Sequence, residues 1–171
     1  YEILRRGLKL KWTSFARVDT VSEDILSKMK AAGCTAVSFG VESANRAILK
    51  TIKKRITPEQ VVEAVRMCAR SGVTPFASFI LGLPGETPET IRETMEFDGK
   101  LKELGLLYGF HLLAPFPGTD VREHSTPYGI RILTDDWTQY HANRAVTETE
   151  TVSRGRLDAI AVEWEDNFNR Y

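Results

Sequence analysis

The sequence lacks an excess of either charge and lacks a long apolar run. Its 171 residues include 23 Lys and Arg and 23 Asp and Glu, so no net field attracts nucleic acid or an anionic membrane surface. Although 42% of the residues are apolar, no uninterrupted apolar run approaches the roughly 18 residues needed to span a bilayer. We therefore expect no nucleic-acid partner and no membrane span, and the charge by itself indicates no partner.

Cysteine is also scarce. Cys34 and Cys68 show no C-x-x-C spacing, which disfavours a disulfide or a metal pair and favours buried free thiols in a reducing cytosol. We predict a cytoplasmic protein. The chain begins with Tyr1 rather than Met, and no basic-then-apolar leader follows. We therefore expect a piece of a longer polypeptide, with the rest of that polypeptide as its partner.

Strand-like and helix-like segments alternate from the start of the chain to about residue 120. We expect strands at 12–18, 35–41, 73–81 and 106–113, and helices at 22–33, 44–52, 57–72 and 87–104. This alternation predicts an α/β fold with a parallel sheet. Four strands cannot close a barrel of the usual six or eight, so the sheet is either open or part of a barrel. We predict a partial (β/α) barrel of about four parallel βα units over residues 1–133.

The pattern changes after Asp120. We expect a C-terminal helical extension over residues 134–171, with a short helix near Trp137, a polar stretch at 147–151 and an amphipathic helix at 153–168 that includes Leu157, Ile160, Trp164 and Phe168. An incomplete barrel exposes a sheet edge and an apolar interior, so we also predict self-association of this fragment.

The chemistry should lie where the four strands end, because parallel strands place their carboxyl ends on one rim. A cofactor carboxylate would suit Arg17 or Lys54, and an ammonium or ribose would suit Glu42. An adenine ring would suit Ile80 and Leu113. The alternative is that Arg17 and Glu42 form an ordinary ion pair and that the glycines at 82 and 85 only turn the chain. His111, in the fourth expected strand, is either a substrate contact or a hydrogen-bonded structural residue.

Several segments, taken in order, resemble the second half of the core domain of radical S-adenosylmethionine (radical SAM) enzymes. They are Gly40-Val41-Glu42-Ser43, Lys54-Arg55-Ile56-Thr57, Phe79-Ile80-Leu81-Gly82-Leu83-Pro84-Gly85-Glu86-Thr87 and Pro115-Phe116-Pro117-Gly118-Thr119. The resemblance covers about residues 12 to 140. It is greatest to the branch of iron-sulfur oxidoreductases that often carry a cobalamin-binding domain.

The resemblance implies roles for individual residues. Glu42 and Ser43 match positions that contact the ribose and methionine parts of S-adenosylmethionine. Ile80 matches an apolar position beside the adenine, and residues Leu113 to Pro115 match the next strand end that borders it. Arg17 and Lys54 match basic positions near the cofactor carboxylate.

One family feature is absent. The sequence has no C-x-x-x-C-x-x-C, whose thiolates hold the 4Fe-4S cluster. In the family this segment lies upstream, so the resemblance implies cluster ligands outside this chain, with a cobalamin domain also upstream in some members. The parent would then reduce S-adenosylmethionine to methionine and a 5′-deoxyadenosyl radical that abstracts hydrogen from substrate. That this substrate is a small molecule is implied only by the resemblance. By itself the fragment would be inactive, contributing part of the cofactor pocket and a wall of the substrate cavity.

Two alternatives remain open. The first is a non-catalytic binding or assembly domain that keeps the βα-barrel fold. The second is another βα-barrel enzyme, of the aldolase or phosphate-binding type. The second needs a Schiff-base lysine at a strand end or an uninterrupted glycine run at a helix start. Lys54 lies in a connection and Pro84 interrupts the glycines, so this alternative is the less favoured.

Overall fold

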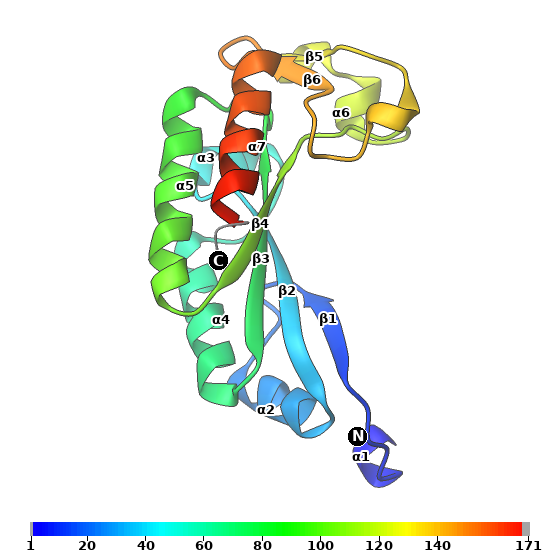
Figure 1. Ribbon diagram of the computed structural model, residues 1–171, viewed down its shortest axis with the longest axis vertical. Helices are drawn as coiled ribbons and strands as arrows, with labels where there is room; N and C mark the ends of the chain where they lie inside the picture. Colours follow the sequence, from blue (N-terminus) through cyan, green and yellow to red (C-terminus); the bar gives the residue numbers. More distant parts are fainter. Residues whose placement is uncertain (1, 169–171) are drawn as a thin grey trace.

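A four-stranded parallel sheet forms the centre of the molecule (Figure 1). The structure, a computed structural model, describes residues 2–168, with side chains to residue 163. The sheet has the order β1-β2-β3-β4, from β1 (Trp12–Ala16), β2 (Cys34–Glu42), β3 (Thr74–Leu81) and β4 (Leu107–Leu112). Since the described strands do not close on themselves, the prediction of a partial (β/α) barrel is confirmed.

Three of the four crossover helices begin within one residue of the expected positions, and the short helix after β2 begins at Arg46 rather than at residue 44. The four helices are α2 (Glu23–Ala31), the short α3 (Arg46–Thr51), α4 (Pro58–Ser71) and α5 (Pro88–Glu103). Thr57 and Thr87 each form a capping box, and each is followed by proline at the first helical position. This arrangement satisfies backbone N–H groups that have no partner within the helix. The local sequence alone therefore fixes where these two helices start.

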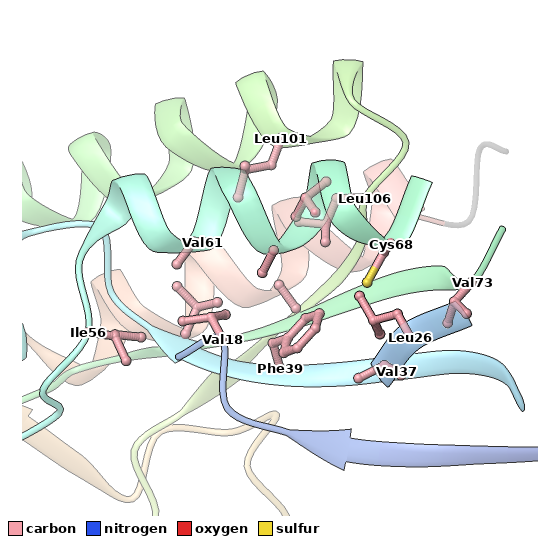
Figure 2. Close-up of a cluster of buried hydrophobic side chains, with 14 of the residues drawn as sticks. Val18, Leu26, Val37, Phe39, Ile56, Val61, Cys68, Val73, Leu101 and Leu106 are labelled. Carbon is pink, nitrogen blue, oxygen red and sulfur yellow. The ribbon is translucent and has the colours of Figure 1, made fainter. Parts of the chain in front are cut away.

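The helices cover one face of the sheet. Alternate strand residues on that face are buried against α2 and α4. Val37 and Phe39 of β2 are shown in Figure 2, and Phe79 of β3 belongs to the same core. Cys34 and Cys68 are free thiols within this core, as predicted. Burial raises the pKa of Cys68 to about 11. Leu104, an apolar residue at the end of the helix expected over residues 87–104, lies outside this core: it follows the end of α5 and is 36% exposed.

The opposite face of the sheet is open to solvent. One row across the strands pairs Phe15 with Ser38, Ser38 with Phe76, and Phe76 with Leu107. Phe15 is 89% exposed and Leu107 is 47% exposed. In a closed barrel this face would be the interior, so we call it the open face below.

The C-terminal part forms a small lobe and a long helix. Elements not yet given are α1 (Glu2–Arg5), α6 (Asp120–Glu123), η1 (Thr126–Tyr128), β5 (Ile130–Ile132), η2 (Trp137–Gln139), β6 (Thr147–Thr149) and α7 (Arg154–Phe168). In Figure 1, β5, β6 and α6 lie beyond the end of the sheet opposite to α1. None of the helices in the described residues combines the length and the apolarity required to cross a bilayer.

Two expectations about this part had different outcomes. The stretch 147–151, expected only to be polar, includes strand β6, which pairs antiparallel with β5. Strands of three residues are too short to show an alternating pattern, and an Arg131–Glu148 ion pair crosses this ribbon. The terminal helix forms as predicted, and Leu157 and Ile160 pack in a second core with Leu81 and Leu112. The predicted contributions of Trp164 and Phe168 lie outside the described side chains.

Candidate functional site

The predicted site residues follow the strand ends and lie along one edge of the parallel sheet. Glu42 is the last residue of β2, Ile80 lies next to the end of β3, and Leu113 directly follows β4. Arg17 directly follows β1. Since all four strands are parallel, these ends meet at one edge, which we call the carboxyl rim.

Glu42 has an unusual backbone. The pairing of β2 with β3 shifts between Gly40 and Glu42, which marks a β-bulge. The N–H of Ser43 donates to the C=O of Val41 at 2.9 Å, and φ of Glu42 is +69°. This is a γ-turn of the rare positive-φ type, which is strained for a residue with a side chain. Bulges of this kind turn a side chain away from the regular alternation of its strand.

The Glu42 carboxylate forms an ion pair with Lys54. Lys54 Nζ lies 2.7 Å from Glu42 Oε1, and the two side chains are 19% and 18% exposed. Both lie against Gly40, where an added Cβ would come within 2.5 Å of Glu42 Oε1 and 2.9 Å of Lys54 Nζ. The pair therefore depends on the absence of a side chain at position 40.

Small residues continue from Gly40 across the open face. Gly40 is paired with Ser78, and Ser78 with Gly109. His111 Nε2 lies 3.9 Å from the position of a Cβ on Gly109, and His111 is paired with Ile80. A row of small residues is thus flanked by the Glu42–Lys54 pair near one end and by Ile80 and His111 near the other. The open face therefore carries little side-chain bulk along this row.

Arg17 has a different partner from the one that the alternative interpretation gave it. Its guanidinium donates to both carboxylate oxygens of Asp19, at 2.9 and 2.8 Å. The alternative of an Arg17–Glu42 ion pair is therefore wrong. Arg17 pairs with Asp19, two residues further along the chain, and Glu42 pairs with Lys54. The pKa of Asp19 is lowered chiefly by the hydrogen bond from Arg17 and also by the charge of Lys54. The charge of Lys54, which lies between α3 and α4, is therefore felt by Asp19 just after β1.

Ser43 is placed beneath the rim. Its side chain is fully buried, and its Oγ lies 3.2 Å from Oγ1 of Thr94 on α5 and accepts from the N–H of Asn45 at 3.1 Å. These bonds join the end of β2 to α5. The geometry gives Ser43 a structural role, and its predicted contact with a cofactor rests on the resemblance alone.

Glu86 organises the glycine-rich loop and was not predicted as a site residue. Its Oε2 accepts from the N–H of Gly82 at 2.7 Å and of Leu83 at 3.1 Å. The residue is fully buried, and its Oε1 has no partner among the described residues. Burial raises the pKa of Glu86 to about 7, although the two backbone hydrogen bonds oppose the shift. The sequence did contain an indication of this role, because an acidic residue directly follows the glycine-rich turn.

Leu113 and Pro115 lie next to that loop on the β4 side. The N–H of Leu113 donates to the C=O of Leu81 at 2.9 Å, so the sheet continues past β4. Its Cβ lies 3.8 Å from the position of a Cβ on Gly82, while Pro115 is buried. Leu113 and Ile80 therefore supply apolar surface on strand ends that are neighbours in the sheet.

The described residues do not supply a metal centre. Within residues 2–168, no group of three or more His, Cys, Asp and Glu side chains could hold a metal ion. Cys34 and Cys68 lie in the apolar core beneath the helices. An iron-sulfur cluster therefore does not fit this part of the chain.

Comparison with known proteins gives consistent results. A sequence model described as the Radical SAM superfamily matches residues 1–97. An uncharacterised methyltransferase of Pyrococcus horikoshii is 38% identical over 81% of this chain. An anaerobic magnesium-protoporphyrin IX monomethyl ester cyclase of Rubrivivax gelatinosus is 27% identical over 91% of it.

A solved structure shares the fold. The radical S-adenosylmethionine methyltransferase TsrM of Kitasatospora setae, with cobalamin and a 4Fe-4S cluster bound, aligns with 78% of this chain and 29% of its own at a TM-score of 0.64 and 24% identity. The chain spans 29% of the Pyrococcus relative and 28% of the Rubrivivax relative. It thus corresponds to under a third of each of these proteins.

Proposed function

Since the chain belongs to the radical SAM superfamily, whose cofactors are S-adenosylmethionine and a 4Fe-4S cluster, we propose that its carboxyl rim forms part of the S-adenosylmethionine site of a longer enzyme. The observation that carries this proposal is the Glu42–Lys54 ion pair, 2.7 Å long and mostly buried, at the end of β2. It lies beside a row of small residues on the open face.

The rim residues suit the parts of this cofactor. Its amino-acid end carries an ammonium and a carboxylate, and Glu42 and Lys54 offer one group of the opposite charge for each. Arg17, bound to Asp19, is a second basic group on the rim. Ile80 and Leu113 offer apolar surface for the adenine, while Pro115, which is buried, would act indirectly by supporting the end of β4. Ser43 would act indirectly, by fixing the end of β2 against Thr94.

The iron-sulfur cluster requires ligands that these residues do not provide. We propose that the rest of the parent polypeptide supplies three cysteines, and that an upstream domain holds cobalamin if the reaction uses it. When bound, the cluster supplies the electron for one-electron chemistry. This chain would bind and orient the cofactor and contribute a wall of the substrate cavity, and would be inactive by itself.

We propose methyl transfer to a small molecule as the reaction class. The support is the 38% identity to a methyltransferase and the fold shared with a second one. This is more specific than the oxidoreductase or lyase activity expected from the sequence. The free, buried thiols of Cys34 and Cys68 favour a cytoplasmic location. The alternative, a non-catalytic binding domain, would keep the fold without cofactor chemistry.

The test is cofactor binding to the complete polypeptide, reconstituted anaerobically with iron and sulfide. We expect Glu42→Gln and Lys54→Met each to weaken S-adenosylmethionine binding by about tenfold or more in calorimetry, which corresponds to about 1.4 kcal/mol. The matched control is Glu59→Gln, since Glu59 forms an exposed ion pair with Arg46 and should leave the affinity unchanged.

Two results would contradict the proposal. Unchanged affinity in the Glu42 and Lys54 variants would remove these residues from the site. No binding by the unmodified protein, and no 5′-deoxyadenosine or methylated product after reduction, would favour the non-catalytic domain.

A further inference from the structure

A second pocket adjoins the carboxyl rim, and the proposed cofactor site does not account for it. It lies between α3 and the connection to α4, and it is lined by Arg46, Leu49, Lys50, Lys53, Lys54, Arg55 and Ile56. Its volume is about 370 Å³, within the range of roughly 300–1,000 Å³ found for small-molecule sites. We call it the basic pocket.

The basic pocket has apolar residues at its base and cations around it. Leu49 is 2% exposed and Ile56 is 6% exposed, so both belong to the packed interior. The other lining residues are all Lys or Arg. This combination differs from a flat charged surface, because the apolar base excludes water from one side and strengthens the attraction of an anion.

The cations outnumber their carboxylate partners. Arg46 pairs with Glu59 at 2.6 Å and Lys54 with Glu42 at 2.7 Å. Lys53 lies 3.8 Å from Asp120, which is a weak contact. For the other two lining cations, Lys50 and Arg55, the described residues provide no ion pair or hydrogen-bonding side chain.

This positive surplus is local. The whole chain carries equal numbers of basic and acidic residues, so two cations without partners in one pocket are not the result of a generally basic protein. Like charges brought together repel one another, and an anion in the pocket would remove that cost.

One close contact joins the basic pocket to the rim, and a weaker one joins it to α6. Lys54 reaches Glu42 at the end of β2, and Lys53 reaches Asp120 in α6, beyond the end of β4. Lys53 also has a φ of +57°, a left-handed conformation that is unfavourable for a residue with a side chain. The connection therefore takes a sharp turn that directs consecutive lysines to different partners.

We propose that the basic pocket binds an anionic group, a carboxylate or a phosphate, of the enzyme's small-molecule substrate. This inference rests on the proposed function, because it assigns the substrate end of the same rim. A nucleic acid is disfavoured, since a single pocket on a neutral chain lacks the extended basic surface that tracks a phosphate backbone.

The test measures binding of inorganic pyrophosphate and of citrate to the complete polypeptide by calorimetry at fixed ionic strength. The variant is Lys50→Gln with Arg55→Gln, which removes the two unpaired cations and keeps Lys54. The matched control is Lys9→Gln with Arg66→Gln, which removes the same charge from exposed positions outside the pocket. S-adenosylmethionine binding is measured on each variant as well.

We expect the pocket variant to weaken binding of the better anion by about tenfold, and the control by less than twofold. Preference for citrate would assign a carboxylate and preference for pyrophosphate a phosphate, and either supports the site. Equal loss in both variants, no binding by the unmodified protein, or tighter binding of a single-stranded RNA oligonucleotide than of either anion would overturn it.

The two proposals can fail separately. The pocket variant should bind S-adenosylmethionine normally, because it keeps Glu42 and Lys54. Unchanged S-adenosylmethionine affinity in the Glu42→Gln and Lys54→Met variants contradicts the cofactor site whatever the pocket variant does, and unchanged anion affinity in the pocket variant contradicts the basic pocket whatever those two variants do.

Discussion

Glu42 occupies a backbone position that favours glycine. With φ at +69° and a three-residue turn closed by Ser43, a residue with a side chain is strained there by roughly 1–3 kcal/mol. The sequence nevertheless has a glutamate whose carboxylate is bound to Lys54. The side chain therefore has a use that outweighs the strain, in agreement with a role in binding.

Gly40 allows this ion pair to lie flat against β2, so Gly40→Ala is the most specific test of the geometry. The added methyl group would come within 2.5 Å of Glu42 Oε1 and 2.9 Å of Lys54 Nζ. Because both atoms end flexible side chains, we expect a folded protein whose unfolding free energy changes by less than about 1 kcal/mol. We expect its S-adenosylmethionine affinity to fall severalfold in calorimetry. If Gly40→Ala bound S-adenosylmethionine with unchanged affinity, binding would not depend on the position of the Glu42–Lys54 pair against Gly40.

Glu86 makes stability depend on pH. Its pKa is about 7 in the folded protein, against an ordinary value of 4.5. Between these two pH values the folded state holds a proton on Glu86 that the unfolded state has lost. The contribution of Glu86 to the free energy of unfolding is therefore complete below pH 4.5 and is lost as the pH rises to about 7. At 1.36 kcal/mol per pKa unit, the loss is at most about 3 kcal/mol.

Glu86→Gln tests this, because an amide can accept the same two backbone hydrogen bonds without ionising. We expect the variant to gain stability relative to the unmodified protein as the pH rises from 5 to 8, as measured by urea unfolding. The comparison cancels the contribution of Asp98, whose pKa burial also raises to about 7. As a control, Glu59→Gln at an exposed position should show no such gain. If the difference in unfolding free energy between Glu86→Gln and the unmodified protein did not change between pH 5 and 8, a buried and protonated Glu86 carboxyl would be contradicted.

At the level of elements, α5 contains an avoidable weakness. Gly99 lies inside the helix with nothing within 4 Å of an added Cβ. We expect Gly99→Ala to raise the free energy of unfolding by about 0.5–1 kcal/mol, since glycine is the weaker helix former. Chemical denaturation measures this change. The variant also serves as the glycine-to-alanine control for Gly40→Ala, because its cofactor affinity should not change.

The sequence predicts elements better than it predicts the contacts of side chains at the rim. Capping residues such as Thr57 and Thr87 identify helix starts because they act on neighbouring backbone groups. The β-bulge at the end of β2 has no such local indication. It changes the direction of the side chains that follow, so Ser43 meets Thr94 and Glu42 meets Lys54, contacts that strand alternation does not predict.

At the level of the whole molecule, the four crossover and terminal helices α2, α4, α5 and α7 pack on one face of the sheet (Figure 1). The open face carries Phe15 and Leu107 on the two outer strands. Exposed apolar residues on outer strands favour pairing with another chain. Self-association of this fragment therefore remains a prediction.

Phe15→Lys tests that prediction. A charge in place of a ring that is 89% exposed should leave the fold intact and oppose association through the open face. We expect the unmodified fragment to show a concentration-dependent rise in average mass in sedimentation equilibrium, and the variant to stay monomeric over the same range. Monomeric behaviour of both proteins would contradict the prediction.

The short segment between Glu42 and Lys54, which includes α3, also bears on how the chain folds during synthesis. Only 12 positions separate the two charges, whereas the hydroxyl contact of Ser43 with Thr94 spans 51. Contacts between near neighbours in sequence form with little loss of chain entropy. During synthesis on the ribosome, we expect the Glu42–Lys54 ion pair to form first. The hydrogen bond between Ser43 and Thr94, which fixes the end of β2 against α5, can form only after α5 has left the ribosome.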